Sequence, residues 1–493
     1  MTEREFYKKA LSPVRLFTST VSGRTTIREF ASDRSRIVYS PAFRRLQQKA
    51  QVFSLVENAA VRSRLTHSLE VADIGRLIAD AVATQLEDKE WIESGLVPAF
   101  VQVVENSCLM HDIGNPPFGH LGEAAIQDWF RNNWEDVASL SIESEELEAL
   151  KASYLQDFLQ FDGNPQGLRI VTRLQGLKLA QGMNLTCSQL LAFIKYLRDP
   201  NGDPGEGLHK KPGYFATETD LVESARKTLV VGNGRHPAVY LMEAADDASY
   251  CVSDIEDGIE QGVITAADFF YELAEEWSAR EDLPADHALL GAASLLNKSL
   301  ELKPHVAHSD RLRENFYNFK AEVSRALQAE AARLYVLAHD QIMTGSLPEL
   351  FSEEEPVGVF LKCLKVVATK RLFRSLEAEK LELAGYHMIS GLLDHFSPLL
   401  RLRRNLFQQL VSNRVKIPKT VTNRKLQLER RLFDLLPPAY VEAYNNQLNG
   451  LDEPVGGDAE WGLRAHLIVD FISGMTDDFA LRTHQLLSGI DVH

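Results

Sequence analysis

Apolar residues recur at spacings of three or four through most of this 493-residue chain, and this periodicity constrains its fold more than any other feature. Examples are Val71, Ile74, Ile78 and Val82 in one segment, and Phe100, Val104 and Cys108 in another. Because such spacings return side chains to one face of a helix, the pattern predicts amphipathic helices. The alternation of apolar and polar residues that is typical of half-buried strands is scarce. We therefore expect an all-α protein.

At 493 residues, the chain is long enough to form more than one structural domain. We expect residues 1–262 to form a catalytic region, since the motifs described below lie there. Residues 263–493 are expected to form a helical region that packs on it and serves oligomerisation. Within the first region, a long loop is predicted at Asp199–Tyr214, which is rich in Pro, Gly and Asp. Loops of this length often carry function.

Composition excludes several classes of protein. The net charge of −16 argues against a surface that is basic overall. The four cysteines have no pair spacing, so a disulfide framework is not expected and a reducing compartment fits. No apolar run approaches the roughly 20 residues that a membrane span requires. The N-terminus lacks the apolar core of a signal peptide. We expect a cytoplasmic protein that does not enter a membrane.

The dipeptide His111–Asp112 places two metal-binding side chains next to each other at a predicted helix end. His111 closes an apolar helix, and Gly114 with the proline pair after it ends that helix. An imidazole and a carboxylate at such an open end can bind one cation if further ligands come from elsewhere. His67, on the inward face of another helix, is one candidate. Alternatively, His67 is a hydrogen-bonded core histidine.

The fourth ligand should be a carboxylate, and the adjacent Asp246 and Asp247 supply two. At 100° per residue, Asp246, Tyr250 and Asp254 form a stripe opposite the apolar face of their helix, whereas Asp247 lies between the two. We therefore choose Asp246 as the ligand and expect Tyr250 and Asp254 to face a substrate. Alternatively, this stripe is a solvated face. Two His and two Asp suit Mg²⁺ or Mn²⁺, or Fe²⁺ and Ni²⁺, better than a thiolate-preferring metal.

A second pair, His120 and Glu123, follows the proline break. If a new helix begins near Gly119, the two side chains share a face. A carboxylate that holds an imidazole fixes its tautomer and raises its basicity, as proton transfer requires. We interpret the pair as catalytic, although a simple helix-start pair is the alternative. Whether His120 acts as acid, base or nucleophile stays open.

The order His67, His111–Asp112 and Asp246 resembles the HD-domain phosphohydrolase superfamily. More narrowly, five stretches resemble bacterial deoxyguanosine triphosphate triphosphohydrolases, namely residues 33–47, 51–53, 64–68, 111–120 and 243–247. The resemblance implies an HD-domain helical core and a divalent metal ion, Mg²⁺ or Mn²⁺. It also implies hydrolysis of dGTP, or of other dNTPs, to a deoxynucleoside and tripolyphosphate. It further implies a homo-oligomer.

The resemblance also assigns roles to particular residues. It implies metal ligation by His67, His111, Asp112 and Asp246, and catalysis by His120 with Glu123. It implies substrate binding by Gln51 and Val52 beside the nucleoside, Arg64 on the phosphates, and Tyr250 and Asp254 near the sugar.

Two basic stretches stand out in this acidic chain. The first, from Arg24 to Arg64, holds nine Lys or Arg and three acids, and it could attract a triphosphate through Arg44, Arg45, Lys49 and Arg64. The second, from Arg401 to Arg431, holds ten Lys or Arg and one acid. Its clusters include Arg403, Arg404, Arg424 and Lys425. We expect single-stranded DNA or an effector nucleotide to bind there; the alternatives are a solvated face and a subunit contact.

Two other functions compete with the triphosphohydrolase. The nearer one is another HD-family nucleotide phosphohydrolase or a phosphodiesterase. The other, from a different class, is a nucleic-acid-binding sensor with a vestigial metal site.

Overall fold

The computed structural model describes residues 1–19, 21–55, 58, 60–176, 179–229, 232, 234–278, 283–302, 310–413, 426–452 and 454–490. Within these ranges the regular structure is helical, and β pairing is limited to three isolated bridges. The prediction of an all-α protein is confirmed. In the same ranges, no helix is both long and apolar enough to cross a membrane.

The α-helices of the described residues are α1 (Glu3–Ala10), α2 (Thr26–Val38), α3 (Pro41–Arg45), α4 (Arg64–Asp88), α5 (Val97–Met110), α6 (Gly119–Ala138), α7 (Ser144–Ala152), α8 (Leu155–Leu159), α9 (Gly163–Arg169), α10 (Cys187–Leu191), α11 (Thr219–Leu229), α12 (Pro237–Glu260), α13 (Ala266–Ser278), α14 (Leu290–Leu300), α15 (Asp310–Leu337), α16 (His339–Thr344), α17 (Pro356–Ala368), α18 (Leu376–Leu400), α19 (Arg404–Asn413), α20 (Gln427–Leu435), α21 (Pro438–Leu448), α22 (Gly457–Ser473) and α23 (Asp477–Leu487).

Three of these helices, α4, α5 and α12, pack against one another and form the core around which the site is built. Gly75 of α4 allows the close approach. A Cβ at this position would lie 2.4 Å from Cys108 Sγ of α5 and 3.4 Å from Ala245 Cβ of α12. Because no side chain fits there, α4 can bring its first turn up to the end of α5.

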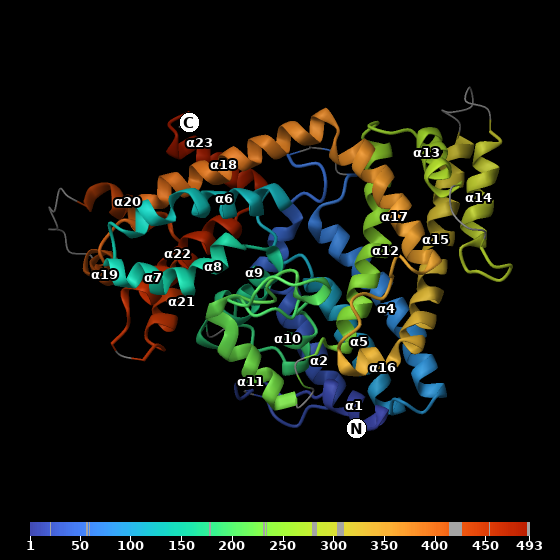
Figure 1. Cartoon of the computed structure of the whole chain (residues 1–493), viewed down its shortest axis with the longest axis horizontal. Coiled ribbons are helices and arrows are strands. Elements are labelled where there is room, and N and C mark those ends of the chain that lie inside the picture. The colour runs from blue at the N-terminus through green and yellow to red at the C-terminus, as the bar shows by residue number, and fades with distance from the viewer. Residues whose placement is uncertain are drawn as a thin grey trace.

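The C-terminal helices cover this core on two sides. In Figure 1, α15 and α17 lie beside α4 and α12, whereas α18 crosses the molecule and packs on α6. Helix α22 is buried along almost its whole length and lies between α18 and α21. Residues beyond 262 therefore surround the earlier part of the chain, so they are in a position to contribute to the site.

Charged side chains in the interior of α22 are paired. Arg169 donates to both carboxylate oxygens of Asp470 through its Nε and Nη2 groups, and Asp470 also accepts a hydrogen bond from Gln166. His466 Nε2 lies 2.9 Å from an oxygen of Asp157. Buried ionic groups are tolerated when they are paired and hydrogen-bonded in this way. These contacts fix α22 against α8 and α9.

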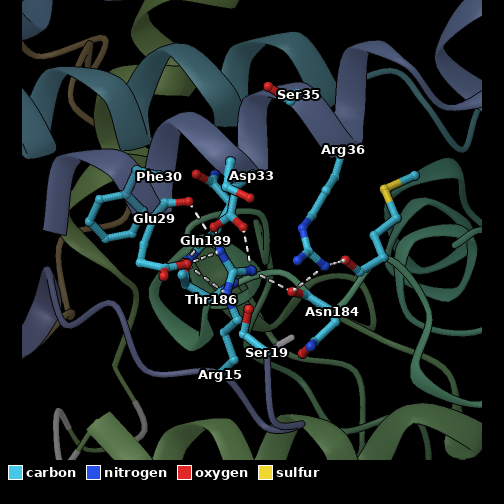
Figure 2. Close-up of polar contacts among 12 residues, drawn as sticks. Arg15, Ser19, Glu29, Phe30, Asp33, Ser35, Arg36, Asn184, Thr186 and Gln189 are labelled. Atoms are coloured by element: carbon cyan, nitrogen blue, oxygen red, sulfur yellow. Dashed lines mark hydrogen bonds and ion pairs between the residues drawn. The ribbon is translucent and has the colours of Figure 1, made fainter. Parts of the chain in front are cut away.

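A separate polar cluster anchors the N-terminal segment (Figure 2). Arg15 pairs with Asp33 at 2.6 Å and with Glu29 at 2.7 Å, both on α2. Asp33 in turn accepts a hydrogen bond from the Thr186 hydroxyl at 2.8 Å. Because Asp33 is fully buried, these partners stabilise its carboxylate. The cluster ties α2 to the start of α10.

Candidate functional site

The residues predicted as metal ligands meet where three helices converge. His67 lies in the first turn of α4, His111 directly follows α5, and Asp246 lies in the middle of α12. His67 Nε2 is 3.2 Å from Asp246 Oδ1, and His111 Nε2 is 3.5 Å from the same oxygen. Three donor atoms of a type that binds divalent metals therefore point at one place.

Asp112 lies beside His111 and is not one of these three converging residues. Its Oδ1 is 3.6 Å from His111 Nε2 and accepts a hydrogen bond of 2.6 Å from the Asn115 side chain. Its Oδ2 pairs with Arg64 Nη1 at 2.6 Å. Burial alone would raise the pKa of Asp112, but Arg64 and the nearby imidazoles lower it to about 2. The carboxylate is therefore ionised at neutral pH, as metal binding requires.

The orientation of His111 fits a bound cation. Its Nδ1 donates to the Cys108 carbonyl at 2.7 Å, which leaves Nε2 without a proton when the ring is neutral. Nε2 is buried and forms no hydrogen bond within the described residues, although it faces two carboxylates. A buried acceptor without a donor is costly, and a cation would satisfy it. The residues present therefore fit the metal ion that the sequence implies.

The choice between Asp246 and Asp247 follows from the phase of α12. Asp247 turns toward α17, where its Oδ1 accepts from Lys365 Nζ at 2.6 Å. Burial raises the pKa of Asp246, but His111 and His67 oppose this and hold it well below the ordinary range. The structure thus brings Asp246, and not Asp247, to the histidines.

His120 and Glu123 lie at the start of α6, one helical turn apart. His120 Nδ1 is 2.9 Å from Glu123 Oε2, while Glu123 Oε1 accepts from the backbone N–H of Gly163 at 2.8 Å. The hydrogen bond that His120 donates to the Glu123 carboxylate raises the pKa of His120. With Nδ1 engaged, Nε2 of His120 is the nitrogen left for a substrate. Helix α6 begins at Gly119, as the sequence predicts.

These residues line a single cavity of about 520 Å³. Its wall includes the predicted ligands, the catalytic pair, and the predicted substrate residues Gln51, Val52, Arg64 and Tyr250. The ring of Tyr250 stacks on Phe373 with centroids 6.0 Å apart, which gives the cavity a flat aromatic face. Gly119, at φ +55°, lets Arg64 reach this wall, since a Cβ there would lie 3.0 Å from Arg64 Nη2.

Asp254 is placed differently from the other predicted substrate residues. It is fully buried, is absent from the cavity wall, and neither of its carboxylate oxygens has a hydrogen-bond partner within the described residues. Burial raises the pKa of Asp254 to about 8. The side chain is therefore mainly protonated at neutral pH, and its contact with a substrate stays a prediction.

The cations of the cavity are mostly not those that the sequence suggested. Arg44, Arg45 and Lys49 do not line it: Arg44 bonds the Tyr39 carbonyl, Arg45 bonds Tyr440, and Lys49 is buried on backbone carbonyls. Besides Arg64, the lining cations are Lys195, Lys211 and Lys365. These three come from the irregular stretch after α10, from the predicted loop 199–214, and from α17, respectively.

Sequence reasoning missed these lysines because each is far along the chain from the motifs. Lys211 pairs with Asp162 at 2.5 Å, and Lys365 pairs with Asp247. The lining holds six carboxylates against four Lys or Arg side chains. Without a bound cation, this excess of negative charge would repel a triphosphate. Charge balance therefore gives a second argument for a metal ion.

Only part of the second basic stretch lies within the described residues, and none of that part lines the cavity. Arg403 is exposed, whereas Arg404 donates to the Val455 carbonyl at 2.7 Å. Arg424 and Lys425 lie outside the described residues. The expectation of DNA or effector binding therefore stays a prediction.

Comparison with known proteins agrees with the geometry. A family model for the HD domain matches residues 64–190, and one for a phosphohydrolase-associated domain matches residues 395–486. The deoxyguanosinetriphosphate triphosphohydrolase of Cronobacter sakazakii is 38% identical over 497 residues, which cover 94% of each chain. The protein of that name from Klebsiella pneumoniae is 38% identical over 505 residues, with 95% of each chain covered. This chain belongs to the HD-domain deoxyguanosinetriphosphate triphosphohydrolase family.

Proposed function

We propose that this protein hydrolyses dGTP to deoxyguanosine and tripolyphosphate with the help of a divalent metal ion. One observation carries the proposal. The donor atoms of His67, His111 and Asp246 converge in a cavity that also holds the His120–Glu123 pair and four cationic side chains. The family membership and the names of the relatives support the same substrate.

The protein side chains divide the work as follows. Arg64, Lys195, Lys211 and Lys365 stabilise the negative charge of the triphosphate, which grows on the α-phosphate oxygens as water attacks the α-phosphorus. The bond that breaks joins this phosphorus to the 5′ oxygen, and deoxyguanosine is the leaving group. His120 transfers a proton at Nε2, since Glu123 holds its Nδ1. Gln51 and Val52 contact the nucleoside, and the Tyr250–Phe373 face packs against it. Apolar and aromatic contacts of this kind position the reacting bond.

We propose that His67, His111, Asp112 and Asp246 hold the metal ion, and that it is Mg²⁺ or Mn²⁺. A bound divalent cation neutralises phosphate charge and lowers the pKa of a water molecule. The two carboxylates and two imidazoles are a mixed oxygen and nitrogen set, which does not favour a metal that prefers thiolates.

The test of this function is the identity of the products. The purified protein is incubated with each dNTP in turn, with Mn²⁺ or Mg²⁺, and the phosphorus products are resolved by ³¹P NMR. Tripolyphosphate and deoxyguanosine from dGTP support the proposal. Orthophosphate or pyrophosphate would instead support another HD-family phosphohydrolase.

We further propose that the protein is a cytoplasmic homo-oligomer, in which residues 1–262 carry the metal ligands and the His120–Glu123 pair. Residues 263–493 serve assembly and also add Lys365 and Phe373 to the cavity wall. Binding of single-stranded DNA near Arg403 is a separate proposal, supported by the basic composition of the 401–431 stretch. Such binding should weaken steeply with salt and should be reduced in Arg403→Ala. Unchanged binding by that variant would remove this part of the proposal.

A further inference from the structure

The corner between α22 and α23 contacts two loops of the active site that are more than 350 residues away in the sequence. Asp477, the first residue of α23, is buried, and each of its carboxylate oxygens accepts one backbone N–H. Oδ2 accepts from Ala50 at 2.9 Å, and Oδ1 accepts from Phe118 at 3.2 Å. One side chain thus bridges two separate segments.

The two segments carry different parts of the site. Ala50 precedes Gln51 and Val52, and all three line the cavity. Phe118 has a left-handed backbone, with φ +61°, and lies two residues before His120. A residue other than glycine in this conformation persists only where its surroundings hold it. By fixing the spacing between the Ala50 and Phe118 backbones, Asp477 therefore also fixes the spacing between His120 and the two residues Gln51 and Val52, which line the same cavity.

Two further contacts reach the same place from the C-terminal helices. Lys49 Nζ donates to the Ser473 carbonyl at 2.9 Å and also to the Asn115 carbonyl at 2.5 Å, so it links the end of α22 to the loop before α6. On α18, a Cβ at Gly385 would lie 2.3 Å from the Phe118 ring. The C-terminal region is thus packed directly against the catalytic loops.

We infer that Asp477 is a positioning residue for the hydrolysis, because its two oxygens hold the Ala50 and Phe118 backbones in a fixed relation. This role rests on the proposed function. It gives the phosphohydrolase-associated region, residues 395–486, a direct part in building the site. Asp477 touches no reacting atom, so it acts through the geometry of Gln51 and His120.

The experiment compares Asp477→Asn with Asp478→Asn. An asparagine keeps one acceptor oxygen but presents an NH₂ group to the other backbone N–H, so one loop is released. Asp478 is exposed and pairs with Arg482 on the same helix, so its variant removes a neighbouring charge without touching either loop. Two readouts are taken, namely hydrogen exchange of peptides covering residues 49–55 and 115–121, and kcat with KM for dGTP.

We expect faster exchange in at least one of the two peptides in Asp477→Asn, with metal binding unchanged. We also expect kcat to fall by about tenfold to a hundredfold, since a misplacement of about 1 Å costs up to about that much. Asp478→Asn should match the parent in both readouts. Normal exchange in Asp477→Asn, or faster exchange with an unchanged kcat and KM, would overturn the inference. If the parent protein does not hydrolyse dGTP, the proposed function fails, while exchange still tests the bridge.

If Asp477→Asn does not fold, Asp477→Glu is used in its place. It keeps the charge and both acceptor oxygens but moves them further from the main chain. A parental kcat in Asp477→Glu, together with faster exchange in the two peptides, would overturn the inference. A reduced kcat in a variant that melts like the parent supports it.

Discussion

Replacing Glu123 by glutamine tests how the catalytic pair works. The carboxylate 2.9 Å from His120 Nδ1 favours the protonated imidazole, so its removal must lower the pKa of His120. The imidazole side chain is 92% exposed, so water screens this attraction. A pair of charges near 4 Å in water is worth about 1 kcal/mol, which corresponds to a pKa change of somewhat less than one unit.

The same substitution also affects the tautomer. The glutamine oxygen can still accept from the Gly163 N–H, but its NH₂ group then faces His120 Nδ1 and drives the proton to Nε2. Because Nε2 is the nitrogen that Glu123 leaves for the substrate, proton transfer there is impaired. Positioned proton transfer contributes about 10²–10⁴-fold to rates, so we expect kcat to fall by about a hundredfold or more.

The assay is kcat for dGTP hydrolysis against pH, for the parent, Glu123→Gln and His120→Asn. The limb of the profile that is absent in His120→Asn belongs to His120. In Glu123→Gln this limb should move to lower pH, by up to about one unit. A limb at the parental pH with a parental kcat would refute the reasoning, since Glu123 would then neither stabilise the imidazolium nor fix its tautomer.

Three further substitutions probe other parts of the site. Lys211→Met should raise KM for dGTP by about tenfold to a hundredfold, because it removes a charge-assisted bond worth about 1.5–3 kcal/mol. Lys210→Met, at the neighbouring position that does not line the cavity, should leave KM within about twofold. In chelator-treated protein, Asp254→Asn should gain stability over the parent as pH rises from 5 to 8. In the folded parent, the buried Asp254 carboxyl has a pKa of about 8, whereas in the unfolded chain its pKa is about 4. The free energy of unfolding of the parent therefore falls as pH rises between these two values. A difference in urea midpoint between variant and parent that does not change with pH would contradict this. Gly75→Ala should lower the free energy of unfolding by about 1–3 kcal/mol, because its Cβ would overlap Cys108, and a neutral result in urea unfolding would show that α4 and α5 can separate freely.

The fold and the convergence of His67, His111 and Asp246 could be predicted because both depend on local patterns. A 3.6-residue period identifies helices, and the phase of α12 separates Asp246 from Asp247. The dipeptide at 111–112 and the break after it mark the open end of α5 without any knowledge of its neighbours. Each of these features is written within about a dozen residues of sequence.

The rest of the site depends on which distant segments meet, and no local pattern contains that information. Lys365 and Asp477 look like ordinary helix residues in the sequence, although one lines the cavity and the other bridges its loops. The basic stretch before Arg64 misled for a related reason. Charge density along the chain does not say which side chains face inward, and Lys49 is buried on carbonyls instead of facing the triphosphate.

Metal binding by single-site variants tests the central claim most directly. The chelator-treated parent, Asp246→Ala and Asp247→Ala are each titrated with Mn²⁺ in a calorimeter, without nucleotide. We predict one tight site per chain in the parent and in Asp247→Ala, and its loss in Asp246→Ala. Tight binding that survives in Asp246→Ala, or that is lost only in Asp247→Ala, would contradict the convergence of α4, α5 and α12 on one cation.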